Sequence, residues 1–206
     1  MIEKLACKLG RNDEVPNIEL AELICQNEET DGIKEIVQGL KDKDKAVAND
    51  CVKVLYEIGS RKPALISGYA EEFLDLLHSK NNRLVWGGMT ALATIAELSP
   101  DVIYDKIELV LSVFKNGSVI AVDNSVTVLA GLCKADKEYE THLFPVLLEH
   151  LRTCRTKEVP QHAERAVICV NKDNAEAFLD VLNFRKEHMD GSRLERVKKL
   201  EKRLKF

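Results

Sequence analysis

The stretch Ile58-Gly-Ser-Arg-Lys-Pro63-Ala-Leu-Ile66 decides the fold, because a later stretch repeats its pattern. Ile95-Ala-Glu-Leu-Ser-Pro100-Asp-Val-Ile103 carries isoleucine, proline and isoleucine at the same places, 37 residues further on (95 − 58 = 37). A fixed interval of this size is typical of proteins built from stacked helical units. The sequence therefore predicts an internal repeat of about 37 residues, with three copies in register and a weaker fourth copy that needs one inserted residue.

The apolar residues inside each predicted unit follow the spacing of an α-helix, and alternation with period two is nowhere sustained. In one unit the apolar positions step by four, three, one and three residues, which places them on one face of a helix; they are Val47, Cys51, Val54, Leu55 and Ile58. A shorter apolar helix and a polar turn precede this face in each unit. Each unit is therefore predicted to be a helical hairpin whose turn supplies Asp, Asn or Ser as a cap for the second helix.

This pattern resembles HEAT repeats, with armadillo repeats a close relative. The resemblance rests on an early proline (Pro63, Pro100), a first helix ending in leucine, a polar turn, and a second helix of the form apolar-x3-small-x2-small-Leu-x2-apolar. It implies an all-α fold, a right-handed α-solenoid of stacked helical hairpins. One departure concerns the arginine that HEAT repeats usually carry near the start of the second helix, where this chain has Ala48, Val85, Val122 and Pro160.

The predicted organisation is a single solenoid domain over residues 1–206. About four repeats occupy residues 30–172, and the flanks 1–29 and 173–206 each contain apolar residues at helical spacing. Because a terminal unit would otherwise expose an apolar face, we expect both flanks to be capping helices.

Composition and charge limit the classes of function. Apolar residues make up 45% of the chain and the net charge is −4, whereas a dedicated nucleic-acid binder is usually basic. A local exception is the segment 193–205, which holds seven Lys or Arg against two Glu. The sequence therefore disfavours nucleic acid as the main partner, and leaves open that this basic C-terminal helix contacts phosphates.

The six cysteines are widely spaced, without a C-x-x-C pair. No signal stretch opens the chain, and no apolar run approaches the roughly 18–20 residues of a membrane span. We expect a cytoplasmic protein whose thiols stay reduced and serve as small core residues.

Catalytic and metal-binding patterns are absent from the sequence at the usual spacings. His142 and His150 are eight residues apart, His162 falls on a different predicted helix, and neither H-E-x-x-H nor H-x3-H occurs. The pair Gly87-Gly88 lies inside a predicted helix, where it indicates close helix packing rather than a phosphate loop. We therefore predict no enzyme activity, no cofactor and no metal.

The strongest functional candidate is Trp86, the only tryptophan in the chain. Its equivalents in the other repeats are polar, so its position is expected to face solvent, and exposed tryptophan is enriched at binding hot spots. The next turn of the same helices continues this face. The predicted partner-binding stripe comprises Asn49, Lys53, Trp86, Thr90, Asp123, Thr127, Gln161 and Arg165.

These features predict a non-catalytic interaction module, an adaptor or scaffold that holds another protein or peptide on the inner face of the solenoid. The alternative is a HEAT-like nucleic-acid-binding protein, including a DNA-glycosylase-like enzyme, in which Trp86 and Asp123 would be neighbours on the concave face. The basic groove that such an enzyme needs is not apparent in the repeats.

Overall fold

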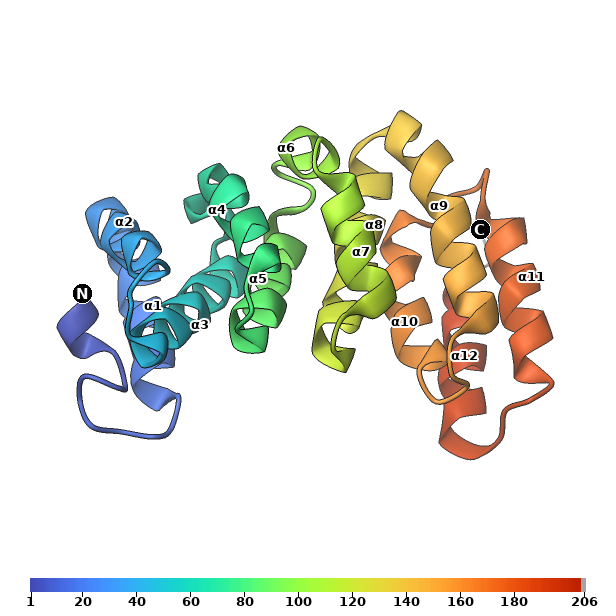
Figure 1. The fold of residues 1–206 in the computed structure, drawn as a ribbon. Helices are drawn as coiled ribbons and strands as arrows, with labels where there is room; N and C mark the ends of the chain where they lie inside the picture. Colours follow the sequence, from blue (N-terminus) through green and yellow to red (C-terminus); the bar gives the residue numbers. More distant parts are fainter. Residues whose placement is uncertain (205–206) are drawn as a thin grey trace. The chain divides into compact units, whose positions relative to one another are not determined.

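The computed structural model describes residues 1–204, which form helices joined by turns, without any strand (Figure 1). Contacts gather the chain into two compact units, Met1–Val128 (the N-terminal unit) and Leu129–Phe206 (the C-terminal unit). The boundary falls inside one helix, α8 (Val119–Ala135). The single-domain organisation over 1–206 stays a prediction.

The N-terminal unit is a series of short and long helices in which α3 packs against α1, α2 and α5, and α5 packs against α4. Besides the first part of α8 its α-helices are α1 (Val15–Asn27), α2 (Thr30–Gly39), α3 (Lys45–Arg61), α4 (Ala70–Asp75), α5 (Asn82–Ile95), α6 (Pro100–Tyr104) and α7 (Ile107–Asn116). Four 3-10 turns complete it: η1 (Ile2–Lys4), η2 (Pro63–Leu65), η3 (Ser67–Tyr69) and η4 (Leu76–His78).

The local sequence explains where these helices begin. The Asp44 carboxylate accepts a hydrogen bond from the amide of Ala46 at 2.9 Å, and the Asn81 side chain accepts one from Arg83 at 3.1 Å. These contacts satisfy amides that have no partner inside the helix, as the polar turns predicted. Pro63 and Pro100 stand at the first positions of η2 and α6, where a missing N–H costs nothing.

The glycine pair in α5 brings this helix close to two neighbours. A Cβ on Gly87 would lie 2.8 Å from both methyl carbons of Val52 in α3, and one on Gly88 would lie 2.9 Å from the backbone oxygen of Phe73 in α4. Both distances are shorter than real contacts allow. The predicted close approach is confirmed, and α5 is fixed between α3 and α4.

The N-terminal flank differs from the expected pair of capping helices. Within residues 1–29 only α1 is an α-helix, because residues 1–10 form η1 and further turns. Side chains from other segments hold this part instead: the amide of Ala6 donates to Asn17 Oδ1 at 3.0 Å and that of Cys7 to Asp50 Oδ2 at 2.8 Å. Gly10 then adopts a positive φ of 68°, which suits glycine and turns the chain away.

The C-terminal unit contains the end of α8 followed by α9 (Lys137–Thr153), α10 (Val159–Ala166), the 3-10 turn η5 (Val167–Cys169), α11 (Ala175–Lys186) and α12 (Gly191–Arg203). Helix α9 packs on α10 and α11, and α12 packs on the same two helices. Arg185 of α11 is only 6% exposed and donates to the carbonyl oxygens of Leu151 (3.1 Å) and Cys154 (2.7 Å). It thereby satisfies acceptors at the end of α9 that have no partner within that helix.

Within residues 1–204, none of the helices has both the length and the apolar character needed to cross a bilayer.

Candidate binding face around Trp86

Trp86 lies half-buried on α5, in contact with one ring from α3 and one guanidinium from its own helix. Its ring centroid is 6.0 Å from that of Tyr56, with the planes inclined at 47°, and the Arg83 guanidinium carbon stands 5.7 Å from the indole centroid. Such tilted aromatic pairs and cation–π contacts fix a ring in place. The indole is therefore fixed in orientation and partly exposed, and it is not part of the buried core.

The charged groups beneath these rings are paired. Lys53, in α3, places its ammonium 4.9 Å from the Tyr56 centroid, 3.0 Å from Glu14 Oε2 and 2.8 Å from Glu57 Oε1. Glu14 also accepts from Arg83. Lys53 is only 7% exposed, so the prediction that this position faces solvent is wrong: the lysine supports the face from below.

The same ion pairs set the protonation of the two glutamates. Burial alone would raise the pKa of Glu57, but hydrogen bonds from Lys53 and Arg61 outweigh it and hold that pKa below its ordinary value. The pKa of Glu14 is also lowered, because hydrogen bonds and charges from Lys53 and Arg83 outweigh the opposite effect of burial. Both carboxylates stay ionised at neutral pH, which keeps Lys53 and Arg83 in place.

Polar side chains join neighbouring helices across this face. The Asn81 amide donates to Asn49 Oδ1 at 2.8 Å, which connects the start of α5 to α3. Thr90 donates to the Trp86 carbonyl at 2.7 Å and accepts from the Asn124 amide of α8 at 2.8 Å. The face around Trp86 is therefore an ordered surface that three helices share.

A hollow of about 410 Å³ adjoins this face where the N-terminal turns meet α3 and α5. Backbone and side chains of several segments line it, among them Cys7, Asp13, Glu14, Asn49 and Arg83. The Cys7 thiol is a poor nucleophile here, because burial and the hydrogen bond with Asp50 raise its pKa to about 11. The hollow offers charged and amide groups for hydrogen bonding next to an aromatic surface.

The structure distributes the eight predicted stripe residues over both units. Asn49, Trp86, Thr90, Asp123 and Thr127 are half-buried in the N-terminal unit, and Lys53 is buried there. Gln161 and Arg165 are half-buried on α10 of the C-terminal unit. A continuous stripe of all eight stays a prediction. Sequence reasoning missed Tyr56 and Arg83, although Arg83 lies three residues before Trp86, a spacing that brings side chains together on a helix.

A second group of chemically competent residues lies in the C-terminal unit, and it corrects the expectation that no metal-ligating set exists. One donor atom from each of His150, Cys154 and His162 lies within 4.8 Å of the others. Burial raises the pKa of the Cys154 thiol to about 11, opposed by the nearby charge of Arg185. The overlooked signal was the spacing H-x3-C, which brings a histidine and a cysteine to one side of a helix end.

Comparison with solved structures establishes the fold. A designed armadillo repeat protein in complex with the peptide (KR)4 aligns with a TM-score of 0.69 at 16% identity, over 91% of this chain and 90% of that one. An engineered protein aligns with a TM-score of 0.65 at 20% identity, covering 99% of this chain and 96% of that one. A chain from a structure on the interaction between cadherin and beta-catenin gives 0.61 at 14% identity, over 98% of this chain and 44% of that one.

The chain is thus an all-α repeat protein of the α-solenoid class, as predicted, while the interval of 37 residues stays a prediction. No protein-family model matches the sequence, and no curated protein matches it either.

Proposed function

We propose that the protein is a non-catalytic scaffold that binds an extended segment of a partner protein on the N-terminal unit, along the face around Trp86. The observation that carries this proposal is the indole itself. It is half-buried, held against Tyr56 and Arg83, and placed beside a hollow instead of inside the core. A rigid, partly exposed tryptophan supplies a large contact area at a low cost in conformational entropy.

The groups around the indole suit a peptide better than a phosphate backbone. The Asn49 side-chain oxygen accepts from Asn81, and its amide nitrogen can donate to a carbonyl oxygen of an extended peptide. The cations beside the two rings are Lys53 at Tyr56 and Arg83 at Trp86, and both are already paired with Glu14 or Glu57. A nucleic acid would have to compete with these carboxylates, which disfavours it as a partner.

The similar solved structures agree with this choice of partner. One is a designed repeat protein in complex with the peptide (KR)4, and another concerns the interaction between cadherin and beta-catenin. In this proposal Asn49, Thr90, Asp123 and Thr127 contact the partner around Trp86, and a role for Gln161 and Arg165 of the C-terminal unit stays a prediction. An adaptor role and a cytoplasmic location complete the proposal.

The single tryptophan makes the proposal testable without a label. Peptides selected by display against the immobilised protein are expected to shift the Trp86 emission on binding. Trp86→Ala, whose affinity is measured by calorimetry because the variant lacks the fluorophore, should weaken their binding by about 30-fold, the effect of losing roughly 2 kcal/mol at a hot spot. Phe184→Ala is the matched control, because Phe184 is a 51% exposed aromatic residue of the C-terminal unit and its removal should leave the affinity unchanged.

Two outcomes would contradict the proposal. Selected peptides that bind Trp86→Ala as tightly as the parent protein would place the site elsewhere. Retention on heparin together with binding of labelled DNA, both lost steeply as salt rises, would instead indicate a nucleic-acid-binding protein.

A further inference from the structure

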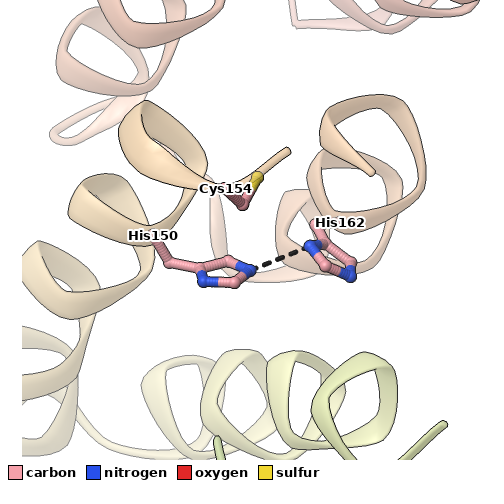
Figure 2. A group of neighbouring side chains, drawn as sticks. All are labelled: His150, Cys154 and His162. Carbon is pink, nitrogen blue, oxygen red and sulfur yellow. Dashed lines mark hydrogen bonds between the residues drawn. The ribbon is translucent and has the colours of Figure 1, made fainter. Parts of the chain in front are cut away.

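Two helices of the C-terminal unit present three metal-ligand side chains to one another. His150 lies in the last turn of α9, Cys154 follows four residues later as the residue that ends this helix, and His162 lies in the first turn of α10. The link 155–158 is a tight turn, in which the amide of Glu158 donates to the Arg155 carbonyl at 2.8 Å. A short connection therefore returns α10 to the side of α9 on which both other residues lie (Figure 2).

The three donor atoms are close enough for one ion. His150 Nε2 and His162 Nδ1 are 2.8 Å apart, and the ring centroids are separated by 4.8 Å. The Cys154 sulfur lies with both nitrogens inside a 4.8 Å limit. At this distance one ring nitrogen carries a hydrogen and donates it to the lone pair of the other, because two facing lone pairs would repel each other.

We propose that His150, Cys154 and His162 bind one zinc ion, which joins the end of α9 to the start of α10. Two imidazole nitrogens and one thiolate form a donor set of the borderline-soft kind that zinc prefers, whereas calcium and magnesium require oxygen ligands. Three protein ligands also match the count at zinc sites that keep a fourth position for water or an incoming group.

Only small movements separate the present arrangement from a tetrahedral site. Zinc–nitrogen bonds of about 2.0–2.1 Å and a zinc–sulfur bond of about 2.3 Å put the two nitrogens about 3.3 Å apart and each about 3.6 Å from the sulfur. The rings must separate by about half an ångström and the sulfur must approach by up to about 1 Å. The Cys154 sulfur has only a weak 3.9 Å contact with the Leu151 carbonyl to give up. Zinc takes the place of the thiol proton, which goes to solvent, and each imidazole binds in its neutral form with its N–H on the ring nitrogen that does not contact the metal.

The surroundings allow an ion to enter and limit what can bind. His162 is only 1% exposed, while His150 and Cys154 are half-buried and form the accessible side. The Glu158 carboxylate lies near His162, and the Arg185 guanidinium, which donates to the Cys154 carbonyl, lies near the Cys154 sulfur. A positive neighbour stabilises the thiolate, and a negative neighbour favours a bound cation.

Cobalt(II) is the most direct probe, because it replaces zinc in tetrahedral sites and a cobalt–thiolate bond gives a charge-transfer absorption. The intact chain, freed of metal with a chelator, is expected to bind one equivalent of cobalt with this absorption, and zinc should displace it. Cys154→Ser should abolish the thiolate band. His150→Asn should weaken zinc binding by more than the roughly 10–100-fold that loss of an outer-shell partner costs.

Two control variants keep the test specific. Cys7→Ser removes another half-buried thiol, and His142→Asn removes an exposed histidine of the same helix α9; both should bind cobalt as the parent chain does. Circular dichroism of each variant without metal verifies that the helices are retained. Absence of a thiolate band at one equivalent of cobalt, or a band that persists in folded Cys154→Ser, would overturn the proposal and leave a His–His hydrogen bond of structural value only.

Discussion

The polar clusters of the two units differ in how their charges are balanced. On the face around Trp86, each basic group meets a carboxylate: Lys53 meets Glu14 and Glu57, and Arg83 meets Glu14. In the C-terminal unit, three Lewis bases face one another from α9 and α10. The first arrangement holds aromatic rings in place through its own ion pairs, whereas the second offers its donor atoms to the proposed zinc ion. A cluster of polar side chains can therefore be a structural support or a binding site, and the balance of its charges distinguishes the two.

One position of the predicted repeat carries different kinds of residue, with different roles, in the two units. Under the predicted repeat, which aligns Trp86 with Gln161, the next residues Gly87 and His162 are also equivalent. Gly87 lets α5 approach Val52, whereas His162 fills the equivalent place with an imidazole that reaches His150. At this position the N-terminal unit has a close approach of α5 to α3, and the C-terminal unit has an imidazole that bonds to a second imidazole.

The largest expected effect is a loss of stability in the C-terminal unit. Arg185→Met keeps the apolar stem but removes the guanidinium that donates to the buried Leu151 carbonyl and the part-buried Cys154 carbonyl, and we expect a loss of about 3 kcal/mol in the free energy of unfolding. Hydrogen exchange resolved by peptide should show the loss in α9 and α11. Arg155→Met, which removes an exposed ion pair with Glu158, should change stability by less than about 0.5 kcal/mol. Equal effects of the two would refute this role of Arg185.

A second substitution tests the close packing of the N-terminal unit. Gly88→Ala forces a methyl group against the backbone oxygen of Phe73, and backbone cannot move aside as a flexible side chain would. Overpacking outweighs the gain in helix propensity, for a net loss of about 2 kcal/mol. Urea unfolding followed by Trp86 emission reports this unit directly. Gly68→Ala, where nothing lies within 4 Å of the new methyl group, should be neutral.

The third prediction concerns the ion pairs beneath Trp86 and their dependence on pH. Lys53→Met should cost about 1–2 kcal/mol at pH 7, because it leaves Glu57 partly buried without its ammonium partner. The pKa values of Glu14 and Glu57 are lowered in the folded protein, so their contribution is complete above the unfolded value of about 4.3 and is lost as pH falls through the folded pKa.

The parent protein should therefore lose stability as pH falls below about 5, and Lys53→Met should lose less over the same range. Urea unfolding at several pH values gives this comparison. Parallel curves for the two proteins would show that the lysine does not set the protonation of these glutamates.

The smallest effects on stability are expected from the helix N-caps, and they should be similar in both units. Asp44 caps α3, and Asp136 caps α9 by accepting from the amide of Glu138 at 2.7 Å. Each substitution to alanine should cost about 1 kcal/mol, the usual contribution of an N-cap. Thermal unfolding of the two variants measures it. A much larger loss for one of them would mean that its carboxylate does more than cap.

Local features of the fold were accessible from the sequence, and features that join distant segments were not. Apolar spacing, Asp44 and Asn81 as caps, and the Gly87-Gly88 contact follow from periodicity and from the chemistry of single residues. The ion pairs of Glu14 with Lys53 and Arg83 depend on how α1, α3 and α5 pack, which no local pattern contains. The solvent-facing prediction failed at Lys53 for this reason.

The metal-ligand group was missed for a different reason. His150 and Cys154 share a helix end and could have been paired by their spacing, but His162 joins them only because the turn 155–158 folds α10 back onto α9. A search confined to established zinc spacings does not include this combination.

The contacts between paired helices also limit which parts of the chain could be exchanged between repeats. In the hairpin of α2 and α3, Gly39 is the small partner of Cys51, whereas in the next one Gly88 is the small partner of Leu76. Under the predicted interval these are the same two positions with large and small reversed (39 + 37 = 76; 51 + 37 = 88). A helix transplanted alone would place glycine opposite glycine, or Leu76 opposite Cys51, so under this interval a whole hairpin, and not a single helix, is the unit that could be exchanged.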